Sequence, residues 1–151
     1  MNGFSSRLRS RLSPLAELRG PRELALFAQV CAFAALVPLL MRLPLPRLAT
    51  LLTRTPRRAR ALDVERLDRL VAIAPRLGRP LVRYGCLTRG VTLFWFLRRA
   101  GVDVELRFGL DPGDGAADGH CWLALDGEPF LEKVDPRPRF AELYRLPLSP
   151  A

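Results

Sequence analysis

The sequence predicts an α+β domain in which N-terminal helices and a central helix pack against an antiparallel sheet. Apolar residues recur at helical spacing in several segments before residue 100. Apolar and polar residues alternate from Val102 to Leu110, as in a half-buried strand. The dipeptide Asp126-Gly127 then separates two short apolar segments, which is a strong signal for a hairpin. A chain of 151 residues is long enough for one domain with its own core.

The first part of the chain is expected to be helical. Pro21 is a good first helical residue, and the helix that it opens should run to about Val37. Pro38 is expected to end or kink this helix, because proline lacks the backbone N–H and its ring clashes with the preceding turn. A shorter helix is expected over Arg47–Leu52.

A basic segment divides the chain into two parts. Arg54–Arg60 contains Pro56 and is expected to form an exposed turn. Residues 1–60 are therefore interpreted as an N-terminal helical segment, and residues 61–151 as the core on which it packs. Because the chain is short, both parts are expected to belong to a single domain.

Two further helices are expected in the core. Asp63 is a good N-cap for a helix over Val64–Ala74, which Pro75 should stop. The next helix, Cys86–Ala100, is too apolar for a surface helix, so it should be the central one. Gly101 is a natural residue to end it.

Strands should follow the central helix. The alternation predicts a strand over Val102–Leu110, and the hairpin signal predicts two more, over His120–Leu125 and about Pro129–Val134. The tail from Asp135 to Ala151 is rich in proline and is expected to be irregular. This order of elements describes a helix packed on an antiparallel meander.

Composition argues against several classes of protein. The net charge is +9, but the basic residues form no stripe interleaved with aromatic residues, and no nucleic-acid partner is expected. Three widely spaced cysteines, Cys31, Cys86 and Cys121, suggest neither a disulfide framework nor a zinc site. We therefore expect a cytoplasmic protein without a metal or other cofactor.

The run Leu24–Met41 carries no charged residue and barely reaches the length of a membrane span. Gln29 and Pro38 lie within it, so a buried helix or a helix on a membrane surface is favoured over a span. Peripheral membrane contact therefore stays open. No small-residue cleavage site follows the basic start cleanly, so a signal peptide is not expected.

The chemistry of the chain centres on Cys86 and on His120, its single histidine. A thiol reacts as the thiolate, which the unpaired N–H groups at a helix start favour, and Cys86 begins the central helix. The same N–H groups are able to hold the oxyanion of an attacked carbonyl. His120 heads a strand after a flexible loop, where it is placed to act as general base. The alternatives are a small buried thiol and a structural histidine.

A third group is needed to orient the imidazole, and strand parity offers two carboxylates. If Asp126-Gly127 is a two-residue loop, His120 lies opposite Lys133, and Asp135 shares the histidine face. If the hairpin carries a bulge, Glu132 shares that face instead. The pattern alone favours Asp135, because a two-residue turn is simpler than a hairpin with a bulge.

Short motifs occur in a fixed order along the core. They are Cys86-Leu87-Thr88-Arg89-Gly90, Leu97-Arg98-Arg99-Ala100-Gly101-Val102, Phe108-Gly109-Leu110, Gly119-His120-Cys121-Trp122-Leu123, Asp126-Gly127 and Leu131-Glu132. Over about residues 60–145 the chain resembles the transglutaminase-like core of the lasso peptide biosynthesis B proteins, the B2 leader peptidases. The resemblance implies a papain-like Cys-His-Asp hydrolase that removes the leader from a ribosomally made precursor peptide.

The resemblance also implies the site residues. Cys86 and His120 match the nucleophile and the base of the family directly. The family's acid falls on Glu132, where this chain has glutamate in place of aspartate, so Glu132 is preferred over Asp135 as the third catalytic residue. The family usually has alanine at the position of Cys121, which is interpreted as a substitution in the core.

The partners follow from the same resemblance. The substrate would be a lasso-type precursor peptide, and a macrolactam synthetase would act on the released core peptide. Some members carry a small leader-recognition domain before the peptidase. The first 60 residues are instead helical and apolar, which implies a separate leader-recognition protein.

Two other functions remain open. A non-catalytic transglutaminase-like protein that binds peptides or acts as a scaffold would need no working triad. A small membrane-associated protein anchored through Leu24–Met41 would make the thiol incidental.

Overall fold

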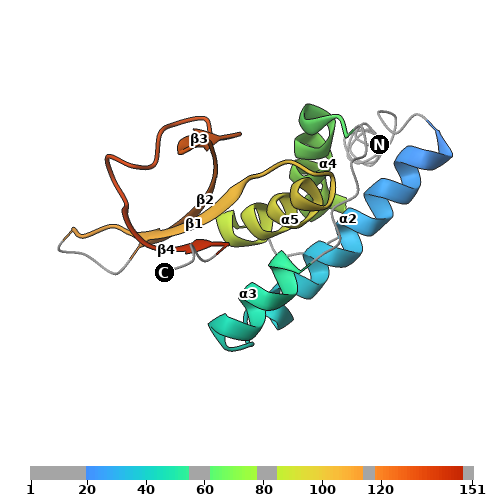
Figure 1. The fold of residues 1–151 in the computed structure, drawn as a ribbon. Helices are drawn as coiled ribbons and strands as arrows, with labels where there is room; N and C mark the ends of the chain where they lie inside the picture. Colours follow the sequence, from blue (N-terminus) through green and yellow to red (C-terminus); the bar gives the residue numbers. More distant parts are fainter. Residues whose placement is uncertain (1–19, 55–61, 78–84, 114–117, 148–151) are drawn as a thin grey trace, which may run out of the picture.

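The computed structural model describes residues 20–54, 62–77, 85–113 and 118–147. Helices come first and strands follow, so the predicted α+β class is confirmed (Figure 1). The helices are α2 (Pro21–Leu40), α3 (Leu45–Thr53), α4 (Val64–Leu77) and α5 (Cys86–Arg99). The strands are β1 (Glu105–Leu110), β2 (Gly119–Leu125), β3 (Glu128–Phe130) and β4 (Ala141–Leu146).

Helix α5 is the central helix, as its apolar sequence predicts. It packs against β1 and β2 on one side and against α2 and α4 on the other (Figure 1). Nearly all of its residues from Thr88 to Arg98 are buried. The helix ends at Arg99, and Gly101, with a φ of 92°, turns the chain after it. The N–H of Gly101 bonds the carbonyl of Arg98, and the N–H of Val102 bonds that of Leu97.

The sheet is antiparallel throughout, with strand order β3-β2-β1-β4. Asp126 and Gly127 both have positive φ, 52° and 86°, which fits a two-residue hairpin loop between β2 and β3. Leu125 therefore lies opposite Glu128, and Leu123 opposite Phe130. This is the tight register that the Asp-Gly signal predicts.

The two N-terminal helices contribute to the core. Helix α2 buries one stripe, Phe27, Val30, Ala34 and Val37, and helix α3 buries Leu48, Ala49 and Leu52. In the described part of the chain, α2 alone is long and apolar enough to cross a membrane by length and composition. Its buried stripe packs against α4 and α5.

Both prolines expected to stop a helix lie inside one. Helix α2 continues past Pro38 to Leu40, and the N–H of Met41 still bonds the carbonyl of Val37 at 2.9 Å. Helix α4 continues past Pro75 to Leu77. Each proline falls in the last turn, where a missing N–H costs a single backbone bond and leaves little helix to disrupt.

The C-terminal part differs from the prediction in two places. The third strand ends at Phe130 rather than near Val134, because Leu131 has a φ of 60°, outside the range of an extended strand. The tail is not irregular throughout, since β4 pairs with β1. Gly109 permits this pairing, because a Cβ there would lie 2.8 Å from the carbonyl oxygen of Ala141.

Some expectations fall outside the described residues. They are the basic start before residue 20, the expected turn after Arg54, and the loop before Gly85 that leads to the cysteine.

Candidate active site

Cys86 is the first residue of α5, with Gly85 at the N-cap position. The backbone of Gly85 is extended, and a side chain there would meet nothing within 4 Å among the described residues. The first N–H groups of a helix have no carbonyl partner inside it, so they surround the thiol with unpaired donors. The Sγ atom lies 4.0 Å from the carbonyl oxygen of Gly119, the residue before the histidine. Cys86 therefore faces the start of β2.

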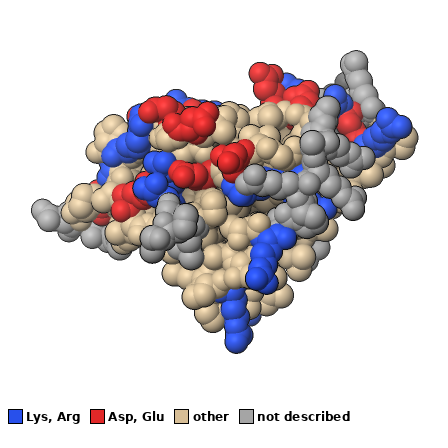
Figure 2. All heavy atoms as spheres, in the orientation of Figure 1, with Lys and Arg blue, Asp and Glu red and all other residues tan. Residues whose placement is uncertain are grey.

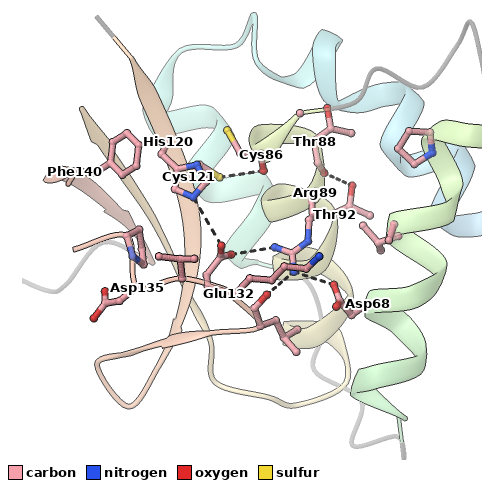
Figure 3. A pocket seen from close by; sticks show the side chains of 18 of the residues that line it. Asp68, Cys86, Thr88, Arg89, Thr92, His120, Cys121, Glu132, Asp135 and Phe140 are labelled. Carbon is pink, nitrogen blue, oxygen red and sulfur yellow. Dashed lines mark hydrogen bonds and ion pairs between the residues drawn. The ribbon is translucent and has the colours of Figure 1, made fainter. Parts of the chain in front are cut away.

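His120 is the second residue of β2. Its ring stacks on Phe140 at 5.0 Å and lies almost parallel to Trp122 at 6.1 Å between ring centroids. These aromatic rings restrict the orientation of the imidazole. Figure 3 shows the side chains of Cys86 and His120 on the same side of one pocket, and both line it.

Glu132 is the carboxylate that the structure brings to His120. Its Oε2 lies 3.8 Å from Nε2 of the imidazole, and its side chain is 13% exposed. That distance is longer than a hydrogen bond and suits an ion pair with a protonated imidazole.

Asp135 is held elsewhere, although it also borders the pocket. Its carboxylate is bonded by the guanidinium and the backbone N–H of Arg137, which hold the pKa of Asp135 below its usual value. Figure 3 shows it turned away from His120. The strand alternation that was expected to place Asp135 on the face of His120 does not extend to this residue. Strand β3 ends at Phe130, so residues 131–135 no longer alternate between the two faces of the sheet.

Arg89 holds the carboxylate of Glu132 in place. This arginine lies in the first turn of α5 and donates to Glu132 Oε1 at 3.0 Å, to the carbonyl of Leu131 at 2.6 Å and to Asp68 of α4 at 2.9 Å. One oxygen of Glu132 is thus held by Arg89 while the other points to His120 (Figure 3). Contacts between neighbouring side chains thus link Asp68, Arg89, Glu132 and His120.

The sequence interpretation did not identify Arg89, Asp68 or Phe140 as site residues. A signal was present for Arg89, the one charged residue in the apolar stretch from Cys86 to Leu97. A charge on a buried helix needs a partner, and here the partners come from α4 and from the segment after β3. Phe140 had no comparable signal, because its role depends on how the tail folds back.

Cys121 lies beneath the first turn of α5, where it forms part of the pocket lining. It is 4% exposed, and its Sγ approaches the carbonyl oxygen of Cys86 at 3.6 Å. Burial raises the pKa of Cys121, so this thiol stays protonated at neutral pH. The expected core position of Cys121 is confirmed.

The pocket that joins these residues has a volume of about 780 Å³. It is bordered by α4, the start of α5, the start of β2 and the segment from Leu131 to Phe140. Its size is that of sites that take a small ligand or a few residues of a peptide. Within the described residues, no group of three or more His, Cys, Asp or Glu side chains is placed to hold a metal ion.

The arrangement provides a thiol at a helix start, an imidazole beside it and a carboxylate behind the imidazole, which are the parts needed for acyl transfer through a thioester. The family model of the transglutaminase-like superfamily matches residues 28–145, a range that contains all three groups. That superfamily includes cysteine peptidases. Searches of curated proteins and of solved structures found no match. The chain belongs to the transglutaminase-like superfamily.

Proposed function

We propose that this protein is a cysteine peptidase that removes the leader from a lasso-type precursor peptide, with Cys86 as nucleophile, His120 as base and Glu132 as the orienting acid. One observation carries the proposal. A carboxylate lies 3.8 Å from the single histidine, in a pocket that also holds a thiol at a helix start. The geometry supports thiol chemistry, and the motifs quoted above support the choice of substrate.

The first step forms a thioester. The imidazole of His120 accepts the thiol proton, and Cys86 Sγ attacks the carbonyl carbon of the scissile peptide bond. Backbone N–H groups in the first turn of α5 stabilise the oxyanion. The C–N bond then breaks, the imidazolium gives its proton to the leaving amine, and the leader stays attached to sulfur.

The second step restores the enzyme. His120 takes a proton from a water molecule, whose oxygen attacks the thioester carbon. The C–S bond breaks, the proton returns to sulfur, and the leader leaves with a new carboxyl terminus. No cofactor is needed, because each proton passes through the same imidazole.

Glu132 and Arg89 act on the imidazole rather than on the substrate. The carboxylate stabilises the imidazolium that forms in each step and orients the ring. Arg89 prevents Glu132 from rotating away, because it binds both the carboxylate and the neighbouring carbonyl. Hydrogen bonds in such sites are often long without substrate and shorten in the complex.

The proposed biological setting follows the resemblance. A separate leader-recognition protein would deliver the precursor, and a macrolactam synthetase would close the released core peptide. The cysteines of the described residues are free thiols, in keeping with a reducing cytoplasm.

Hydrolysis in ¹⁸O-labelled water tests the proposal. A lasso-type precursor peptide is incubated with the protein and a leader-recognition protein, and the masses of the products are measured by mass spectrometry. We expect two fragments, with one ¹⁸O atom in the new carboxyl terminus of the leader. Release of the core peptide with transfer of the leader to an amine would contradict a peptidase. That outcome would still agree with a thioester intermediate on Cys86.

A non-catalytic peptide-binding protein is the second candidate. The observation that favours it is the contact of Cys86 Sγ with the carbonyl oxygen of Gly119 at 4.0 Å, because this acceptor is not the imidazole. In that case the precursor would bind with measurable affinity and remain uncut, whether or not the recognition protein is present.

A further inference from the structure

An exposed apolar surface lies where α2 meets α3, away from the candidate active site. Leu36 and Leu39 are neighbours on the outer face of α2, and α3 begins at Leu45 after a short turn. We call this surface the α2–α3 corner, and its exposed residues are Leu36, Leu39, Arg42, Leu45, Arg47 and Leu51.

Each of the four leucines of the corner exposes more than half of its surface. Leu36 is 51% exposed, Leu39 59%, and Leu45 and Leu51 are each 54% exposed. A single exposed leucine is ordinary on a protein surface. Leu36 and Leu39 lie near the C-terminal end of α2, Leu45 begins α3, and Leu51 lies in the last turn of α3. Four exposed leucines within sixteen consecutive residues are a concentration of the kind that marks an interaction site.

The charge around these leucines has one sign. From Leu24 to Arg54 the chain contains no aspartate or glutamate, and its charged residues are the exposed Arg42, Arg47 and Arg54. Figure 2 shows the surface over α3 as tan with blue side chains and without red, in contrast to the mixed charges over the sheet. The corner therefore combines apolar and basic groups without acidic ones.

The opposite side of the same helices is occupied. Phe27, Val30, Ala34 and Val37 of α2 pack in the core, as do Leu48 and Leu52 of α3. Inserting α2 across a bilayer would remove this stripe from α4 and α5. The corner is thus available to a partner only along its outer face.

We propose that the α2–α3 corner binds the surface of an anionic lipid bilayer. The leucines enter the boundary between headgroups and acyl chains, and the arginines contact the anionic headgroups, as in other interfacial helices. A second copy of this chain suits the corner less well, because self-association would bring its arginines together without acids to meet them. The proposal does not depend on the peptidase activity.

Vesicle sedimentation tests it. The full chain is mixed with unilamellar vesicles of equal parts phosphatidylglycerol and phosphatidylcholine, or of phosphatidylcholine alone, and the bound fraction is measured. We expect binding to the anionic vesicles only, with loss of binding in about 1 M salt, where the Debye length falls to about 3 Å.

Two sets of variants separate the apolar and basic contributions. In R42Q/R47Q the partition coefficient should fall by roughly fivefold for each arginine removed. In L39E/L51E we expect a loss of at least about tenfold, because two buried apolar contacts become repelled charges. The matched control is Leu143→Glu on β4, which changes a leucine that is 65% exposed and lies outside the corner. Thermal melting verifies that each variant folds.

Three results would overturn the proposal. The first is no sedimentation with anionic vesicles at low salt. The second is binding that R42Q/R47Q leaves unchanged, and this variant removes no apolar group, so it is expected to fold. The third is a wild type that forms a dimer in light scattering and does not bind vesicles, together with an L39E/L51E variant that is monomeric. This result would assign the corner to contact with a second copy of the chain.

Discussion

Glu132 presents its Oε2 to Nε2 of His120 at 3.8 Å, although β3 ends two residues before the glutamate. The contact is therefore not a cross-strand pair. It depends on Leu131, whose positive φ turns the chain out of the sheet, and on Arg89, which holds both Glu132 and the carbonyl of Leu131. Arg89, a residue of the helix that begins at Cys86, thus positions Glu132.

The choice of acid can be tested with a pair of amide substitutions. Glu132→Gln removes the charge beside His120, and we expect the rate of leader cleavage to fall by about a hundredfold or more. Asp135→Asn should leave that rate nearly unchanged, because Asp135 is bound by Arg137 and points away from the imidazole. Single-turnover cleavage measures both. A large loss in Asp135→Asn with little effect in Glu132→Gln would reverse the assignment.

Arg89 should act as a positioning residue. Arg89→Gln breaks its contacts with Glu132, Leu131 and Asp68, and a carboxylate displaced by about 1 Å is expected to cost about a hundredfold in rate. Arg89→Lys should recover only part of the rate, because an ammonium cannot reproduce the geometry of the guanidinium.

Arg69→Gln is the matched control, since Arg69 is exposed on the adjacent helix α4. Rate and melting temperature are measured for all three variants. A purely structural role of Arg89 would lower the melting temperature and leave the rate of the folded fraction intact.

Gly90 and Cys121 should be coupled in stability. A Cβ at Gly90 would lie 2.5 Å from Cys121 Sγ, so Gly90→Ala overpacks the contact between α5 and β2 and should cost about 1–3 kcal/mol. In a Cys121→Ala background the sulfur is gone, and helix propensity favours alanine over glycine by up to about 1 kcal/mol. Gly90→Ala should then cost much less, because the remaining close contact is Leu106 Cδ1 at 3.2 Å. Denaturant unfolding of the four proteins gives the coupling free energy, and additive effects would contradict this packing.

Alkaline pH should destabilise the fold through Cys121. Burial raises the pKa of Cys121 above the ordinary thiol value of 9.0, so above that pH the unfolded chain loses this thiol proton and the folded chain keeps it. The free energy of unfolding should therefore fall as pH rises past about 9, by up to about 1.4 kcal/mol per pH unit for this one group.

The contribution of Cys121 is the difference between the wild type and Cys121→Ala, measured by denaturant unfolding at several pH values. The alanine variant should lack this part of the slope. Equal slopes would show that Cys121 is not kept protonated by burial.

Much of the fold could be predicted from local chemistry. The Asp126-Gly127 turn indicated the hairpin register, and the apolar run after Cys86 indicated the central helix; both are confirmed. The expected stop at Pro75 was wrong, and so was the expected end of the first helix near Val37, since a proline in the last turn costs little. Strand β4 was missed because its partner β1 is far away in the sequence and prolines surround it.

The site could be predicted only in part. The sequence distinguished Cys86 and His120 by their types and positions, and left Glu132 and Asp135 as alternatives. Parity alone favoured Asp135, because nothing in the sequence marks the positive φ at Leu131 that ends the strand. The resemblance favoured Glu132, which is the carboxylate beside the imidazole. The hydrogen bond from Arg89 to Glu132 and the stacking of Phe140 on His120 join residues far apart in the sequence, so no local sequence pattern reveals them.

The most direct test of the account is the rate of leader cleavage in Cys86→Ala, with Cys31→Ala as the matched control. Cys31 lies on α2 and packs beside the core, outside the pocket. Both variants are followed by mass spectrometry of the precursor under single-turnover conditions, after their melting temperatures have been compared. The account predicts that Cys31→Ala cleaves like the wild type and that Cys86→Ala shows no cleavage. Cleavage by Cys86→Ala at a rate close to that of the wild type would contradict it.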